Sequence, residues 1–190
     1  MAVEVREPYR GLSREELLQK VYDLGANYEI HSYSCSQCTV AALHEVLGFP
    51  DALVKAATMA CGGTAFQLTG TCGGLAGGIM VLDYYFGRPV EHMSHTETIQ
   101  HPNIDDLFVA QPIARSLFNK YMEKYGSITC ANIMAQLFGR LYYFEDMDEF
   151  GKFEKAGAHT DPKKAPDIVG SAARWTLEIL LDKGAVELGK

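Results

Sequence analysis

The clearest chemical signal in this 190-residue chain comes from its five cysteines, Cys35, Cys38, Cys61, Cys72 and Cys130. Their number is odd, and the N-terminal segment lacks the basic start and the apolar run of a secretion signal. Reduced thiols, a metal site or redox chemistry therefore explain these residues better than a disulfide scaffold does. Cysteines buried in a core without chemical function are the alternative.

Three of the cysteines are predicted to lie in the first turn of a helix, behind a serine or threonine that caps it. The predicted pairs of cap and cysteine are Ser34 with Cys35, Thr69 or Thr71 with Cys72, and Ser127 with Cys130. Unpaired backbone N–H groups and the helix dipole favour a thiolate at such a position. The three sulfurs are therefore candidate nucleophiles or metal ligands.

Several other residues could join these thiols. Cys38 follows Cys35 by one helical turn, a spacing at which two sulfurs can share a metal or form a redox pair. Cys61 is predicted at the C-terminus of a helix, where the dipole disfavours a thiolate and a structural role is favoured. His31 and His159 are better placed to act than the three histidines between residues 90 and 103, whose irregular spacing indicates solvated loop residues.

The helix predicted after Cys72 is unusually rich in glycine. Its face without side chains consists of Gly73, Gly74, Gly77 and Gly78. Each glycine costs about 1 kcal/mol relative to alanine inside a helix, so a close approach must compensate. The sequence predicts that another backbone, a cluster or a flat ligand lies against this face.

Apolar residues at helical spacing predict an all-α fold, a compact single-domain bundle of about seven or eight helices over residues 1–190. The predicted helices include one that follows the capping box at Ser13 and ends at Gly25, one over 35–47, one from Pro50 to Cys61, one ending at Phe86, one from Ile104 or Pro112 to Tyr125, and a last helix through Trp175.

The composition limits the classes of partner. The net charge is −7 and no run of basic residues occurs, which argues against nucleic acid and against an anionic membrane surface. No apolar run reaches the roughly 18 residues that a membrane span needs. We therefore expect a cytoplasmic protein, and a homodimer would suit the apolar helix faces.

Four segments together resemble the C_GCAxxG_C_C family of redox-active proteins with four spaced cysteines, which also occurs as a domain in split-Soret cytochromes. The segments are YSCSQ (33–37), GTCGGLAG (70–77), YGSITC (125–130) and PDIVGSAARW (166–175), and the resemblance covers about residues 33–180. It implies a helical domain whose cysteines meet in space and carry redox or iron–sulfur chemistry. The implied ligands are Cys35, Cys72 and Cys130, and the implied cofactor-binding residues also include Gly73, Gly74 and Gly77.

The chain departs from the family pattern at two positions. Gly74 stands where the family has alanine, and Ala165 stands where the family has its fourth cysteine. Because alanine cannot bind a metal, the fourth ligand is either a replacement or absent, and in the second case the cluster is lost or labile. The candidate replacements are Cys38, Cys61, His31 and His159.

Three hypotheses of function follow. The first is an electron-transfer protein with an iron–sulfur cluster, which predicts iron and sulfide in brown protein. The second is an enzyme without a cluster, in which Cys72 or Cys35 attacks a small molecule in a glycine-lined pocket with His31 or Tyr33 as its partner. The third is a binding domain that has no catalytic activity and whose cysteines react slowly.

Overall fold

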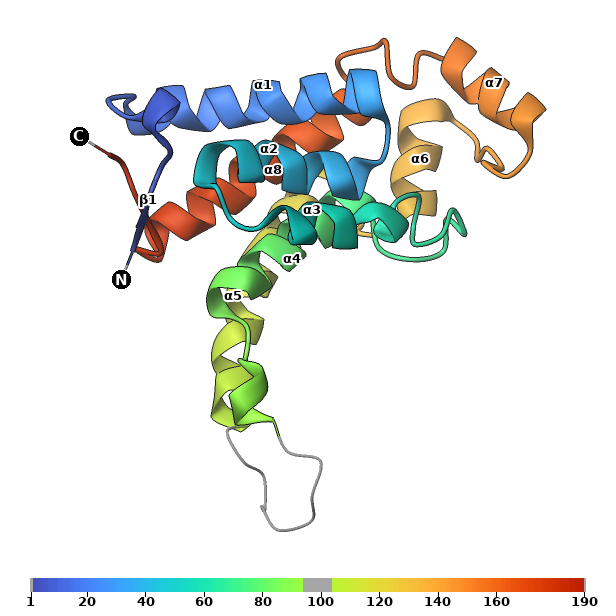
Figure 1. The fold of residues 1–190 in the computed structure, drawn as a ribbon. Helices are drawn as coiled ribbons and strands as arrows, with labels where there is room; N and C mark the ends of the chain where they lie inside the picture. The colour runs from blue at the N-terminus through green and yellow to red at the C-terminus, as the bar shows by residue number, and fades with distance from the viewer. Residues whose placement is uncertain (1, 94–103, 190) are drawn as a thin grey trace.

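The computed structural model describes residues 2–93 and 104–189, which form eight α-helices and one small parallel sheet (Figure 1). The α-helices are α1 (Arg14–Ser32), α2 (Cys35–Leu47), α3 (Asp51–Ala56), α4 (Gly73–Phe86), α5 (Ile104–Tyr125), α6 (Cys130–Phe138), α7 (Met147–Lys155) and α8 (Ala165–Asp182). Shorter elements are the 3-10 helices η1 (Glu7–Tyr9), η2 (Thr58–Ala60) and η3 (Val90–His92) and the paired strands β1 (Val3–Glu4) and β2 (Val186–Glu187). The predicted all-α class is confirmed.

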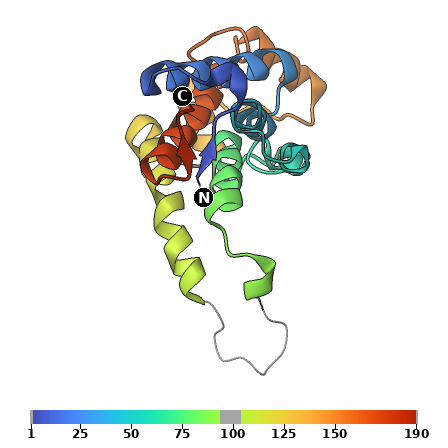
Figure 2. The same ribbon diagram turned by 60° about the vertical axis from the view of Figure 1, so that its left-hand side comes forward.

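Helices α1, α2, α4 and α8 pack around the larger of two hydrophobic clusters, and α1 packs against α8 (Figures 1 and 2). Side chains that are completely or almost completely buried in this cluster include Leu17, Leu43, Leu75, Leu117, Leu177 and Leu180. A smaller cluster surrounds α6 and α7, with Met134, Tyr142 and Phe153 among its buried members. The two clusters support opposite sides of the candidate site described below.

The helix predicted to end at Gly25 continues to Ser32, because Gly25 is a packing residue and not a cap. A Cβ atom at Gly25 would lie 3.1 Å from the Val169 carbonyl oxygen and 3.2 Å from the Gly170 Cα. The missing side chain therefore allows α1 to pack closely against the backbone of α8. The extra turns of α1 bring Glu29 and Tyr33 to the candidate site.

Two further boundaries differ from the predictions. The helix predicted from Pro50 to Cys61 ends at Ala56 and is followed by η2, which leaves Cys61 in an extended conformation. Ser34 does not cap α2, because its φ of 90° turns the side chain away from the helix start, and Tyr33 also has a positive φ of 53°. These two residues make the sharp turn between α1 and α2.

The N-terminal half of α5 and the segment that carries η3 project beyond the body of the protein (Figures 1 and 2). Helix α5 continues through Pro112, and its C-terminal half buries Ile113, Leu117 and Tyr121 against the core. Within the described residues, no helix combines the length and the apolar character that crossing a membrane requires.

Candidate functional site

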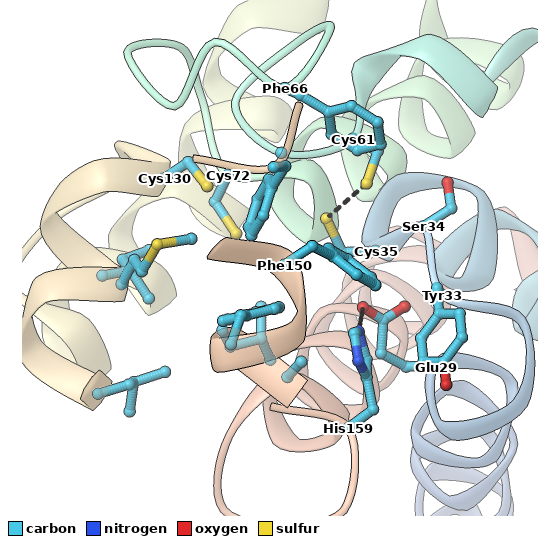
Figure 3. Close-up of a pocket in the computed structure, with 18 of the residues that line it drawn as sticks. Glu29, Tyr33, Ser34, Cys35, Cys61, Phe66, Cys72, Cys130, Phe150 and His159 are labelled. Atoms are coloured by element: carbon cyan, nitrogen blue, oxygen red, sulfur yellow. Dashed lines mark hydrogen bonds and ion pairs between the residues drawn. The ribbon is translucent and has the colours of Figure 1, made fainter. Parts of the chain in front are cut away.

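Four cysteines from four separate segments line one cavity of about 320 Å³ (Figure 3). They are Cys35, Cys61, Cys72 and Cys130. Ala165, where the family resemblance implies a fourth cysteine, lines the same cavity. The convergence of Cys35, Cys72 and Cys130 agrees with what the family resemblance implies, and Cys61 is an additional thiol that the sequence favoured as structural.

The Cys35 and Cys61 sulfurs lie 3.8 Å apart, and the Cys35 thiol donates to the Cys61 sulfur. Cys35 is the first residue of α2, whereas Cys61 follows η2 in extended backbone. The two residues meet because η2 packs against the start of α2. Gly73 permits this arrangement, since a Cβ there would lie 2.3 Å from the Cys35 sulfur.

Cys72 and Cys130 are held side by side by a short antiparallel bridge between Thr71 and Thr129. The Cys72 N–H donates to the Ile128 carbonyl over 2.7 Å, and the Cys130 N–H donates to the Gly70 carbonyl over 3.0 Å. Cys72 is the N-cap residue of α4 and Cys130 is the first residue of α6. Both helix starts are therefore fixed to each other through backbone hydrogen bonds.

Burial overrides the effect that the helix starts were predicted to have on these thiols. Burial raises the pKa of Cys72 to about 12. The charge of a Cys35 thiolate also raises this pKa, whereas hydrogen bonds from the N–H groups of Leu75 and Gly74 lower it. The pKa of Cys130 is raised mainly by burial, and that of Cys35 is raised mainly by its hydrogen bond with Cys61 and then by burial. Without a metal, these three thiols are protonated at neutral pH.

The rest of the cavity wall is largely apolar and aromatic. It is formed by Phe66, Ile133, Met134, Leu137, Phe138, Phe144, Phe150, Phe153 and Ile168. The rings of Phe144 and Phe153 are 4.9 Å apart and those of Phe150 and Phe153 are 6.2 Å apart, within the usual range of aromatic pairs. This wall limits the access of water to the thiols.

The polar part of the wall includes Glu29 and His159, together with Ser32, Ser34 and Thr58. The His159 Nε2 lies 3.6 Å from the Glu29 Oε1, and its Nδ1 lies 2.5 Å from the Glu154 Oε1. His159 is 6% exposed and Glu29 is 3% exposed, and the second oxygen of Glu29 has no partner. The ring of Tyr33 packs on His159 with centroids 4.1 Å apart.

Sequence reasoning missed Glu29, although the pattern contains a signal for it. Leu17, Val21, Gly25 and Glu29 follow one another at intervals of four residues, and all four are buried. A carboxylate that continues a buried stripe of a helix needs a partner or a function. Here it lies at the cavity, next to His159.

Other predicted site residues lie outside the cavity. Cys38 is 2% exposed and its sulfur lies 3.7 Å from the Tyr33 carbonyl oxygen. His31 is exposed and pairs with the Asn27 carbonyl oxygen. His92 pairs with Asp106, and the other two histidines of that loop, at positions 95 and 101, lie outside the described residues.

The glycine face of α4 is occupied by neighbouring helices. A Cβ at Gly74 would lie 2.6 Å from the Tyr121 hydroxyl, and one at Gly77 would lie 2.4 Å from the Ser36 carbonyl oxygen. Of the alternatives that the sequence left open, close approach of another backbone is therefore the one observed at Gly77. Gly73, Gly74 and Gly77 are not part of the cavity wall.

The fold and the cavity define a helical protein in which cysteines from distant segments converge on one apolar pocket. Residues 33–179 match the family described as "Putative redox-active protein (C_GCAxxG_C_C)". The chain belongs to this family, and the match agrees with the predicted extent of about 33–180. No curated protein and no solved structure matches the chain.

Proposed function

We propose that this protein is a redox protein that binds an iron–sulfur cluster through Cys35, Cys61, Cys72 and Cys130. The observation that carries the proposal is the position of Cys61, which lines the cavity together with the three family cysteines and with Ala165. The loss of a ligand at Ala165 is then compensated by a thiol from another segment. The family membership supports the redox role.

The chemistry of the four side chains fits such a cluster, because iron–sulfur clusters are held by cysteine thiolates. The raised pKa values of Cys35, Cys72 and Cys130 mean that these thiols keep their protons in the metal-free protein. A cluster would displace these protons on binding and would hold the sulfurs as thiolates. The cluster would supply one-electron transfer to a partner protein or a small molecule.

The backbone provides hydrogen bonds to the sulfurs. The Gly62 N–H lies near the Cys35 sulfur, and the Gly74 and Leu75 N–H groups lie near the Cys72 sulfur. Such donors and the apolar wall are the usual means by which a protein sets the potential of a cluster.

A single metal ion fits this site less well. In residues 2–93 and 104–189, no three His, Cys, Asp or Glu side chains are placed to hold one ion. The sulfurs are instead distributed around a cavity of about 320 Å³. We therefore favour a polynuclear cluster over zinc.

The decisive experiment moves the fourth ligand between two positions. We expect the wild-type protein, purified and reconstituted without oxygen, to contain iron and acid-labile sulfide, and Cys61→Ala to lose most of both. Because Ala165 lines the same cavity, the double variant C61A/A165C should regain them. Cys38→Ala is the control, since the Cys38 side chain is buried outside the cavity wall, and it should retain the wild-type content.

Two results would contradict the proposal. One is wild-type protein that takes up neither iron nor sulfide on reconstitution. The other is a Cys61→Ala variant with the full iron and sulfide content of the wild type, which would exclude Cys61 as a ligand. Zinc without sulfide would identify a different metal site.

A further inference from the structure

The contact between Cys35 and Cys61 is the starting point for a second activity. Their sulfurs are 3.8 Å apart, and no other pair of cysteines in residues 2–93 and 104–189 makes a sulfur–sulfur hydrogen bond. We propose that these two thiols form a dithiol–disulfide couple that reacts with small, uncharged organic disulfides in the cavity. This inference concerns the metal-free protein and does not depend on the proposed cluster.

The backbone around the pair can accommodate the bond. A disulfide has sulfurs about 2.05 Å apart, so the two atoms must approach by less than about 2 Å. Cys61 lies outside any helix, between η2 and Gly62, whose φ is 59°. A small movement of Cys61 therefore closes the gap without disrupting a helix.

The structure also distinguishes this pair from the C-x-x-C pair that the sequence suggested. The Cys38 sulfur is directed at the Tyr33 carbonyl oxygen, outside the cavity, and it is buried. Cys35 and Cys61 are both partly exposed, and both line the cavity. An oxidant in the cavity thus reaches Cys35 and Cys61 but not Cys38.

The class of oxidant follows from the shape and charge of the cavity. A volume of about 320 Å³ admits a small molecule, and the surrounding wall is largely apolar and aromatic. Glu29 lies in the wall, and the whole chain carries a net charge of −7. Both features disfavour acidic disulfides and favour small neutral ones.

The reaction balances without another reactant. The Cys61 thiol loses its proton and attacks one sulfur of the disulfide R–S–S–R, which forms a mixed disulfide and releases one thiol R–SH. The Cys35 sulfur then attacks the Cys61 sulfur and releases the second R–SH. The two cysteines are oxidised, the organic disulfide is reduced to two thiols, and both cysteine protons end on these thiols.

The experiment uses the full-length metal-free protein, fully reduced and kept without oxygen, with bis(2-hydroxyethyl) disulfide as the probe. We expect the loss of two of the five free thiols, no retained adduct, and a crosslinked peptide that joins Cys35 to Cys61. Oxidised glutathione, which is acidic, should react about tenfold more slowly. Cys38→Ser should still form the crosslink, and Cys35→Ser should retain a mixed disulfide at Cys61.

Several results would overturn the inference. They are five thiols that remain free in the wild type, a crosslink between Cys35 and Cys38, and a crosslink between two molecules. Equal rates with the neutral and the acidic disulfide would overturn the assigned oxidant class. The iron and sulfide analysis is separate, so failure of the couple leaves the cluster proposal intact, and the reverse also holds.

Discussion

At the scale of single residues, Gly73 determines where the Cys35 sulfur can lie. A methyl group at position 73 would come within 2.3 Å of that sulfur and within 3.1 Å of the Ser36 nitrogen. We expect Gly73→Ala to lower the free energy of unfolding of the metal-free protein by about 1 to 3 kcal/mol, because the core must shift to accept the methyl group. Urea unfolding measures the change.

Gly151→Ala is the matched control for this prediction. Gly151 lies inside α7, and a Cβ there has no atom within 4 Å. Its replacement should raise the free energy of unfolding by about 0.5 to 1 kcal/mol, the usual gain of alanine over glycine in a helix. If the two variants gave equal changes, the close contact between Gly73 and Cys35 would be wrong.

The residues of the site differ in how far the sequence revealed them. Cys72 and Cys130 lie at helix starts, as predicted, but the predicted caps are wrong. Cys72 is itself the N-cap residue of α4, Thr129 and not Ser127 is the N-cap residue of α6, and neither makes a side-chain cap hydrogen bond. Cys61 could not be assigned, because its contact with Cys35 depends on how η2 packs on α2. The raised pKa of Cys72 also depends on burial, which is a tertiary property, so the thiolate predicted from local structure is not favoured.

At the scale of elements, the turn between η2 and α4 contains an uncommon backbone conformation. Its residues from Gly62 to Phe66 all have φ between 48° and 73°, in the left-handed region of backbone conformation. Such a conformation costs roughly 1 to 2 kcal/mol at a residue other than glycine. Two of these residues, Gly62 and Phe66, line the cavity, so the turn shapes the site.

This turn leads to a prediction at Ala65, which is exposed and has a φ of 48°. We expect Ala65→Gly to raise the free energy of unfolding by about 0.5 to 1 kcal/mol, because glycine removes the strain at little other cost. The control is Ala135→Gly, at an exposed position of α6. This substitution should lower the free energy of unfolding by about 1 kcal/mol. Equal losses in urea unfolding would show that the turn is not left-handed in solution.

Helix boundaries show the same division between local and tertiary information. The sequence predicts α2 in full, because Gly48 ends the helix in a left-handed conformation with its N–H bonded to the His44 carbonyl. It predicts the wrong end for α1, since a glycine that caps a helix and a glycine that packs against another helix look identical in sequence. Only the contact of Gly25 with α8 separates the two cases.

At the scale of the whole molecule, the cavity lies where the two hydrophobic clusters meet. Cys72 belongs to the larger cluster, and Cys130 packs on the smaller one around α6 and α7. A site between two clusters can keep an apolar space that neither cluster fills. The thiols are therefore buried by the global fold, and their protonation is linked to global stability.

This linkage gives the last prediction, a loss of stability of the metal-free protein at alkaline pH. The pKa of Cys72 rises from 9.0 to about 12 on folding, and those of Cys35, Cys38 and Cys130 rise as well, with burial as the main cause for all but Cys35. At pH values between the unfolded and the folded pKa, the native state holds more protons than the unfolded chain. The free energy of unfolding should thus be constant below about pH 8 and should fall as the pH rises towards 12.

Urea unfolding at a series of pH values from about 7 to about 11 measures this dependence, in which each thiol contributes a slope of up to about 1.4 kcal/mol per pH unit. Cys38→Ser separates titration from packing, since serine does not ionise in this range. The variant should be less stable at neutral pH and should lose less stability per pH unit than the wild type. A flat wild-type curve up to about pH 11 would contradict burial of protonated thiols. An unchanged slope in the variant would show that Cys38 does not contribute to the loss of stability at alkaline pH.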